Sequence, residues 1–252
     1  MTIKFAFCTV NISPLRAENS DPSEMVSQLL FGELVEVIER KENWTQITTL
    51  TDSYTGWCDS KHLIFLSPKE TQRWLDGLTQ QTHLLRKLNT PWGEQWISRG
   101  AFVPADNLQT FQIGSCTFTW SDCVEKLHFD SVAEVAKAYL NTPYLWGGKN
   151  PFGIDCSGLT QVVYRFFDYN LPRDAKDQVV HGAEIQFEEL QENDLAFFQN
   201  DSGKITHVGI ILAENKIIHA AGQVRIDTVT SDGIFNSEKN LLTHRISTFK
   251  RL

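Results

Sequence analysis

The stretch Asp155-Cys156-Ser157-Gly158-Leu159 stands between a segment rich in glycine and proline, residues 144–153, and an apolar stretch with helical spacing. Apolar residues at positions 159, 162, 163 and 166 predict a helix from about residue 156 to 167. Asp155 is a good N-cap, so Cys156 falls in the first turn, where free N–H groups and the helix dipole favour a thiolate. Because a neighbouring carboxylate opposes ionisation, we expect Asp155 to face away or to be occupied by a cation.

Two histidines follow on predicted strands, His207 within residues 204–212 and His219 within residues 216–221. Side chains alternate along a strand, so an even connection would place the two rings on opposite faces. We therefore predict a connection of three or five residues, or a bulge, with Asn215 in the left-handed conformation. A cysteine and two histidines are the parts of a thiol nucleophile, its base and the base's orienter. Taken singly, each of these residues is more often structural than functional, because most free cysteines are small buried hydrophobes.

Five motifs occur in order over residues 128–252 and resemble the NlpC/p60 superfamily, papain-like cysteine peptidases that cut bacterial cell-wall peptides. They are Tyr144-x-Trp-Gly-Gly-x-x-Pro-x-Gly-x-Asp-Cys-Ser-Gly-Leu, Leu171-Pro-Arg-Asp-Ala, Asn193-Asp-Leu-Ala-Phe-Phe, Thr206-His-Val-Gly-Ile and Ile218-His-Ala-Ala-Gly. The resemblance implies Cys156 as nucleophile, His207 as general base and His219 as the third, orienting residue. Ile154, where an aromatic residue is usual, and Asn193, in place of a common glycine, depart from the pattern without touching the chemistry.

The first half of the chain predicts short strands that alternate apolar and polar residues, at residues 32–40, 44–50 and 54–58. Residues 1–66 resemble a bacterial SH3 domain. Residues 67–125 predict a short helical link at 70–78 and strands at 84–88, 95–102 and 111–119, which we assign to a second, degenerate SH3-like domain.

The catalytic domain is predicted to span residues 126–252. Ser131 and Glu134 form a capping-box pattern at its first helix. The nucleophile helix, a short helix after Asp174 and four or five antiparallel strands follow, which gives an α+β domain of helices packed on an antiparallel sheet. Such packing would bring Cys156 to both histidines.

The composition favours an intracellular enzyme. The net charge of −8 argues against binding to nucleic acid or an anionic membrane surface. No apolar run is long enough to span a membrane, and residues 1–8 lack the features of a signal peptide. The five cysteines are odd in number and unpatterned, as in a reducing compartment. We expect a cytoplasmic protein without a cofactor and without a metal, since Cys116, Cys123 and His128 match no usual zinc spacing.

The substrate follows only from the resemblance. An NlpC/p60 enzyme preceded by bacterial SH3 domains resembles intracellular γ-D-glutamyl-L-diamino acid endopeptidases, which recycle murein peptides with a free N-terminal L-Ala. The resemblance implies that an SH3 domain closes the cleft, and that a small murein peptide is the binding partner. The residues implied to bind this substrate are Asp155, Ser157, Asp174, Trp146, Tyr54 and Glu24.

Two alternatives remain at this point. One is a cell-wall peptide binding module whose peptidase fold is inactive, although Cys156, His207 and His219 are all present. The other is a thiol amidase or acyltransferase on another substrate, although related acyltransferases usually place histidine before cysteine. The preferred diamino acid and the oligomeric state are left open by the sequence.

Overall fold

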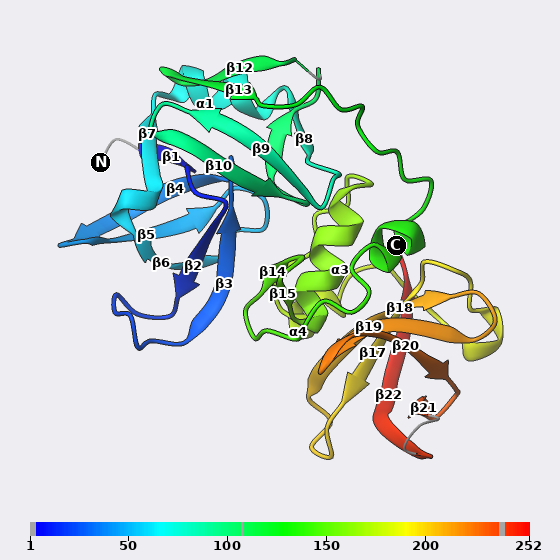
Figure 1. The fold of residues 1–252 in the computed structure, drawn as a ribbon. Helices are drawn as coiled ribbons and strands as arrows, with labels where there is room; N and C mark the ends of the chain where they lie inside the picture. Colours follow the sequence, from blue (N-terminus) through cyan, green and yellow to red (C-terminus); the bar gives the residue numbers. More distant parts are fainter. Residues whose placement is uncertain (1–3, 107, 237–239) are drawn as a thin grey trace. The chain divides into compact units, whose positions relative to one another are not determined.

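The computed structural model describes residues 4–106, 108–236 and 240–252, and the chain divides into two compact units, residues 1–128 and 129–252 (Figure 1). Each unit is described by itself. In the described parts of the chain, no helix combines the length and the apolar character that crossing a bilayer requires.

The first unit begins with a seven-stranded sheet in the order β3-β2-β6-β5-β4-β1-β7. Its strands are antiparallel and confirm the predicted alternating segments, because β4, β5 and β6 coincide with them. Their bounds are β1 Lys4–Cys8, β2 Ile12–Arg16, β3 Met25–Leu30, β4 Leu34–Lys41, β5 Trp44–Thr49, β6 Thr55–Asp59 and β7 Leu63–Leu66, with a 3-10 turn at Ser60–His62.

The remainder of the first unit starts with the predicted helical link, where the Ser67 cap and Glu70 form a capping box. Two small sheets follow, β10-β9-β13-β12 and β11-β8. The predicted strand at residues 111–119 is two strands joined by a turn. One apolar cluster contains both Phe7 and Phe118, so the two halves share a core, and their division into separate SH3-like domains stays a prediction. The bounds are α1 Pro68–Leu75, β8 Leu78–Gln80, β9 Leu85–Thr90, β10 Gly93–Ser98, β11 Phe102–Pro104, β12 Thr110–Ile113 and β13 Cys116–Trp120.

The second unit carries three short helices before its main sheet. Ser131 caps the first helix, as predicted, by accepting from the backbone N–H of Glu134 at 3.2 Å. Two short strands form a hairpin immediately before the nucleophile helix. The bounds are α2 Val132–Lys137, β14 Lys149–Asn150, β15 Gly153–Ile154, α3 Cys156–Arg165 and α4 Ala175–Gln178.

The main sheet of the second unit has seven strands, in the order β16-β22-β17-β18-β19-β20-β21, where we had predicted four or five. Strand β22 also pairs with β21, which closes six of the strands into a ring. Since strands dominate both units and the helices are short, the α+β description fits only roughly. The bounds are β16 Ala183–Ile185, β17 Leu195–Gln199, β18 Ile205–Leu212, β19 Lys216–Ala221, β20 Gln223–Val229, β21 Gly233–Asn236 and β22 Leu241–Arg251, with a 3-10 turn at Phe187–Glu189.

Alternation along β18 sends its side chains to two different cores. Val208 and Ile210 pack in the cluster that contains Cys156 and the apolar residues of α3. Ile211 packs in a second cluster with Phe198 and other residues of the closed ring. Because residues two apart share a face, His207 points to the same side of the sheet as Ile211.

Candidate active site

The first turn of α3 is fixed by its cap and by a close backbone approach. Asp155 Oδ1 accepts from the backbone N–H of Gly158 at 2.7 Å, which confirms the predicted N-cap. A Cβ on Gly158 would stand 2.2 Å from the carbonyl oxygen of Gly148. Only glycine at position 158 therefore lets the glycine-rich segment lie this close to the helix. Because Asp155 is the N-cap, Cys156 is the first residue of α3.

Asp155 is bound on both oxygens by a buried guanidinium. Arg173 donates from Nη1 to Oδ1 at 3.0 Å and from Nη2 to Oδ2 at 2.5 Å. Ser157 Oγ lies between them, accepting from Arg173 at 3.0 Å and donating to Asp155 at 3.3 Å. The backbone N–H of Gly147 adds a further hydrogen bond to Oδ2. The expectation that a cation occupies Asp155 is confirmed.

The sulfur of Cys156 lies against β18, directly beside the strand position of His207. The backbone N–H groups of Val208 and Ser157 donate toward it, but the residue is only 7 % exposed. Burial, followed by the charge of Asp155, raises the pKa of the Cys156 thiol to about 11. We had expected the helix terminus to favour the thiolate, and this expectation is wrong for the resting protein because desolvation outweighs it.

The two histidines share one face and are hydrogen-bonded. Strands β18 and β19 are joined by three residues, with Ile210 opposite Ile218 and Asn215 at φ 53°, as the odd connection requires. His207 Nε2 lies 2.9 Å from His219 Nδ1, and both residues are buried. The predicted pairing of the rings is confirmed.

Sequence reasoning missed the carboxylate beyond this pair. Asp227 Oδ2 lies 3.0 Å from His219 Nε2, and the guanidinium of Arg225 binds both oxygens of the same carboxylate. The signal available in the sequence was an aspartate two residues after an arginine, within a segment that alternates polar and apolar residues.

His244 on β22 was also missed. Its ring stacks on that of His207, with 4.3 Å between centroids and 25° between planes. Burial, then the proximity of His219 and of His244, sets the pKa of His207 well below its usual range. Burial and His219 lower the pKa of His244 to about 4. Burial therefore disfavours the charged form of both the Cys156 thiol and the His207 ring.

The three imidazoles are close enough to raise the question of a metal. One ring nitrogen from each of His207, His219 and His244 lies within 4.8 Å of the others. The His207 and His219 nitrogens that face each other already share a hydrogen bond, and the second nitrogen of His219 serves Asp227. The arrangement is that of a hydrogen-bonded relay, and we identify no metal ligands in it.

The residues predicted to bind substrate are distributed unevenly. Trp146 is 60 % exposed on the segment before α3. Asp174 precedes α4 without capping it, and its Oδ2 lies 3.4 Å from Lys176 Nζ. The sequence assigned no role to Tyr144. Burial, and then the nearby charges of Cys156 and Asp155, raise the pKa of its hydroxyl to about 12, which places Tyr144 in the surroundings of the thiol.

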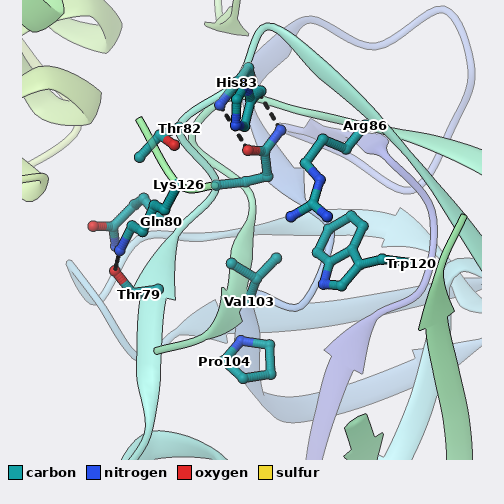
Figure 2. A pocket seen from close by; sticks show the side chains of 10 residues that line it. Thr79, Gln80, Thr82, His83, Arg86, Val103, Pro104, Trp120 and Lys126 are labelled. Carbon is teal, nitrogen blue, oxygen red and sulfur yellow. Dashed lines mark hydrogen bonds between the residues drawn. The ribbon is translucent and has the colours of Figure 1, made fainter. Parts of the chain in front are cut away.

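Tyr54 and Glu24 belong to the first unit, so their approach to the site stays a prediction. A pocket in that unit, shown in Figure 2, is filled by the guanidinium of Arg86 over the ring of Trp120 at 4.0 Å. Its lining residues include one histidine, His83, but no thiol, so the pocket lacks the nucleophile that the proposed acyl transfer needs.

Comparison with known proteins places both units among peptidases. Residues 141–242 match the model of the NlpC/P60 family, and residues 15–63 match that of the bacterial dipeptidyl-peptidase SH3 domain. The "Gamma-D-glutamyl-L-lysine dipeptidyl-peptidase" of Bacillus cereus is 25 % identical over 234 residues, which cover 80 % of this chain and 68 % of the relative. "Dipeptidyl-peptidase 6" of Lysinibacillus sphaericus is 29 % identical over 242 residues, 82 % of this chain and 84 % of the relative.

Another relative has a higher identity over a smaller share of this chain. The "Probable endopeptidase NlpC" of Escherichia coli is 38 % identical over 116 residues, which cover 43 % of this chain and 70 % of the relative. The crystal structure of an NlpC/P60 family protein from Bacillus cereus has the same fold, with a TM-score of 0.77 at 19 % identity, covering 98 % of this chain and 99 % of that one.

Proposed function

The chain belongs to the NlpC/P60 family, and from this premise we propose that it is a cysteine peptidase that cleaves the γ-D-Glu–diamino acid amide of murein stem peptides with a free N-terminal L-Ala. The names of the relatives support the bond, since two of them are dipeptidyl-peptidases acting on γ-D-glutamyl-L-lysine. The match of residues 15–63 to a dipeptidyl-peptidase SH3 domain supports the same class. We place the reaction in cytoplasmic recycling of wall peptides.

The observation that carries the proposal is the hydrogen-bonded pair of His207 and His219 on the strand whose next residue, Val208, donates its backbone N–H toward the thiol of Cys156. Cys156 starts α3 with its sulfur beside the strand position of His207, and His219 holds the Nε2 of His207. The Nδ1 nitrogen of His207 is left for the thiol proton. Such a geometry serves nucleophilic catalysis and has no evident use in a passive binding module.

The proposed reaction proceeds in two acyl transfers. Cys156 Sγ attacks the carbonyl carbon of the γ-glutamyl amide while its proton passes to His207 Nδ1. Backbone N–H groups at the first turn of α3 stabilise the oxyanion. Collapse of the intermediate breaks the C–N bond, and the leaving amine takes the proton from His207. Water, deprotonated by the same ring, then hydrolyses the thioester and restores the thiol. Because burial disfavours the charged forms of the thiol and of the ring, proton transfer would accompany attack.

Recognition of the free amine would draw on carboxylates near the thiol. Asp155 is paired with Arg173, and we propose that Asp174, together with Glu24 and Tyr54 of the first unit, contributes to binding the amine. Ser157 would orient Asp155, and Trp146 would contact the peptide from its exposed position. An acetylated amine carries no positive charge, so it would lose the electrostatic attraction to these carboxylates.

Defined murein peptides test this proposal directly. We expect L-Ala-γ-D-Glu-diamino acid peptides to yield L-Ala-D-Glu, as read by mass spectrometry, and the N-acetylated forms to lose most cleavage. Cys156→Ala should abolish turnover, while Cys123→Ala, at an exposed cysteine, should retain it. Equal rates for free and acetylated peptides would exclude amine recognition, and turnover by Cys156→Ala would exclude the nucleophile.

The first-unit residues need a separate comparison. Glu24→Gln and Tyr54→Phe should raise KM for the free peptide and leave the slow cleavage of the acetylated peptide unchanged. Equal effects of these variants on both peptides would remove the first unit from recognition.

A further inference from the structure

Asp227 lies in β20, on the face of the sheet that carries both histidines. In the register of β19 and β20, Ile217 is opposite Asp227 and His219 is opposite Arg225. Residues 225 and 227 therefore share a face with residues 217 and 219. The side chain of Asp227 is only 4 % exposed, so its hydrogen bonds are made within the protein.

Each oxygen of this carboxylate accepts two donors. Oδ2 takes His219 Nε2 at 3.0 Å and Arg225 Nε at 2.9 Å, and Oδ1 takes Arg225 Nη2 at 3.0 Å and Asn236 Nδ2 at 3.4 Å. Burial alone would raise the pKa of Asp227, but the hydrogen bonds from His219 and Arg225 outweigh it and the pKa falls below its usual value. Asp227 is thus an acceptor on both oxygens.

An ionised carboxylate decides where the ring protons lie. Nε2 of His219 must carry a proton, because a bare nitrogen would oppose an oxygen lone pair at 3.0 Å. In the neutral ring Nδ1 is then an acceptor, so His207 donates from Nε2. The Nδ1 nitrogen of His207 keeps its lone pair, which is the form a general base requires. Arg225 already balances the charge of Asp227, so the carboxylate orients His219 without demanding a second positive charge there.

We propose that Asp227 is a positioning residue for catalysis, which fixes the tautomer of His219 and through it that of His207. The relay has four members, running from Cys156 through His207 and His219 to Asp227. Its ionisable surroundings are Arg225 beside Asp227 and His244 stacked on His207, on β20 and β22 respectively. The activity measurements below rest on the proposed function, whereas the ring-nitrogen measurements do not.

The donors around Asp227 predict what an amide would do in its place. In Asp227→Asn, the amide can place its oxygen at the Oδ1 position, where it still accepts hydrogen bonds from Arg225 Nη2 and Asn236 Nδ2. The amide NH₂ then stands at the Oδ2 position, where it faces one other donor, Arg225 Nε. The reverse orientation sets the NH₂ against two donors. The favoured orientation therefore donates to His219 Nε2. His219 then carries its proton on Nδ1, and so does His207, which can no longer accept from the thiol.

The test measures tautomers and kinetics on the full chain. Two-bond ¹H–¹⁵N correlation spectra should show the Nε2–H form of both histidines in the unmodified protein and the Nδ1–H form in Asp227→Asn. In the same variant kcat should fall on the order of 10²–10⁴-fold with KM little changed. Loss of the negative charge should also move the acid limb of the kcat profile to lower pH. Asp227→Glu should restore both the tautomer and much of kcat.

Asp194 supplies a matched control. Its carboxylate is 3 % exposed and accepts from Arg251 at 2.8 and 2.7 Å and from the backbone N–H of Gln191 at 2.7 Å, so it lies in a different hydrogen-bond network from the two histidines. Asp194→Asn should lower stability and leave tautomers and kcat unchanged. The Nδ1–H form of His207 in the unmodified protein would overturn the proposal, as would an unchanged tautomer in Asp227→Asn. If Asp227→Asn does not fold, the proposal is still tested by the histidine tautomers of the unmodified protein and by the tautomers and kcat of Asp227→Glu. Tautomers that behave as expected without peptide hydrolysis would refute the proposed function alone.

Discussion

Arg173 reaches both carboxylate oxygens of Asp155 from a position in the loop before α4, so the charge beside Cys156 is balanced inside the protein. The pair is almost fully buried, with side-chain exposures of 1 % and 7 %. Asp155 also caps α3, and it accepts the backbone N–H of Gly147. One carboxylate thus ties the glycine-rich segment, the helix and the following loop together.

Asp155→Asn should therefore destabilise the catalytic unit strongly. Removing one partner of a buried ion pair leaves the other charge uncompensated, which costs about 3–5 kcal/mol. Hydrogen exchange of the α3 amides measures the free energy of opening within this unit. Glu184→Gln is the control, because Glu184 is 66 % exposed and its pair with Lys250 should contribute under about 1 kcal/mol. Similar losses in both variants would contradict the buried-pair account.

Alkylation of Cys156 should be slow in the resting protein. Its pKa of about 11 leaves little thiolate at neutral pH, so iodoacetamide should modify the exposed Cys123 first. The rate at Cys156 should rise about tenfold per pH unit until the pH approaches that pKa. Peptide mapping after timed labelling separates the two sites. A rate that levels off below pH 8 would instead show a thiolate–imidazolium pair before substrate binds.

Gly209→Ala should damage the histidine pair more than the fold. A Cβ at this position would stand 2.7 Å from the Ile217 side chain and 3.0 Å from His219 Cβ, so the His219 ring must move. Overpacking of this kind costs about 1–3 kcal/mol, whereas displacement of the ring should lower kcat by more than tenfold. Steady-state kinetics on the murein peptide, beside thermal unfolding, compares the two effects. Gly77→Ala, where nothing lies within 4 Å, should change neither.

Acid should destabilise the catalytic unit through its buried imidazoles. The pKa of His244 is about 4 in the folded protein, below its ordinary value of 6.5, so the unfolded chain binds the proton more readily. The contribution of neutral His244 to the free energy of unfolding is fully present above pH 6.5, and it is lost as the pH falls toward 4. His244→Phe keeps a stacked ring and should flatten the dependence of Tm on pH over this window. His181→Phe, at an exposed histidine, should retain the full slope.

Local patterns in the sequence were enough to predict the nucleophile turn and the histidine hairpin. The cap at Asp155, the helical spacing after it and the parity of the connection each depend on residues close together in the chain. The neutral resting thiol could not be predicted in this way, because the burial of Cys156 depends on how β18 packs against α3.

Asp227 and His244 were missed for a related reason. Asp227 reaches His219 through the register of β19 and β20, and His244 reaches His207 because β22 closes the ring of strands. Neither residue lies in a motif, and both depend on strand pairings that periodicity alone does not reveal. The spacing of Arg225 and Asp227, two residues apart in one predicted strand face, was a local hint.

The three-residue turn between β18 and β19 also limits how this part of the chain can change over time. Adding or deleting one residue there would leave two well-formed strands, yet it would turn the His219 ring to the opposite side of the sheet. Length variation among descendants of this gene should therefore occur in steps of two at this turn. A lineage that breaks the rule should carry a compensating bulge or should have given up peptide hydrolysis.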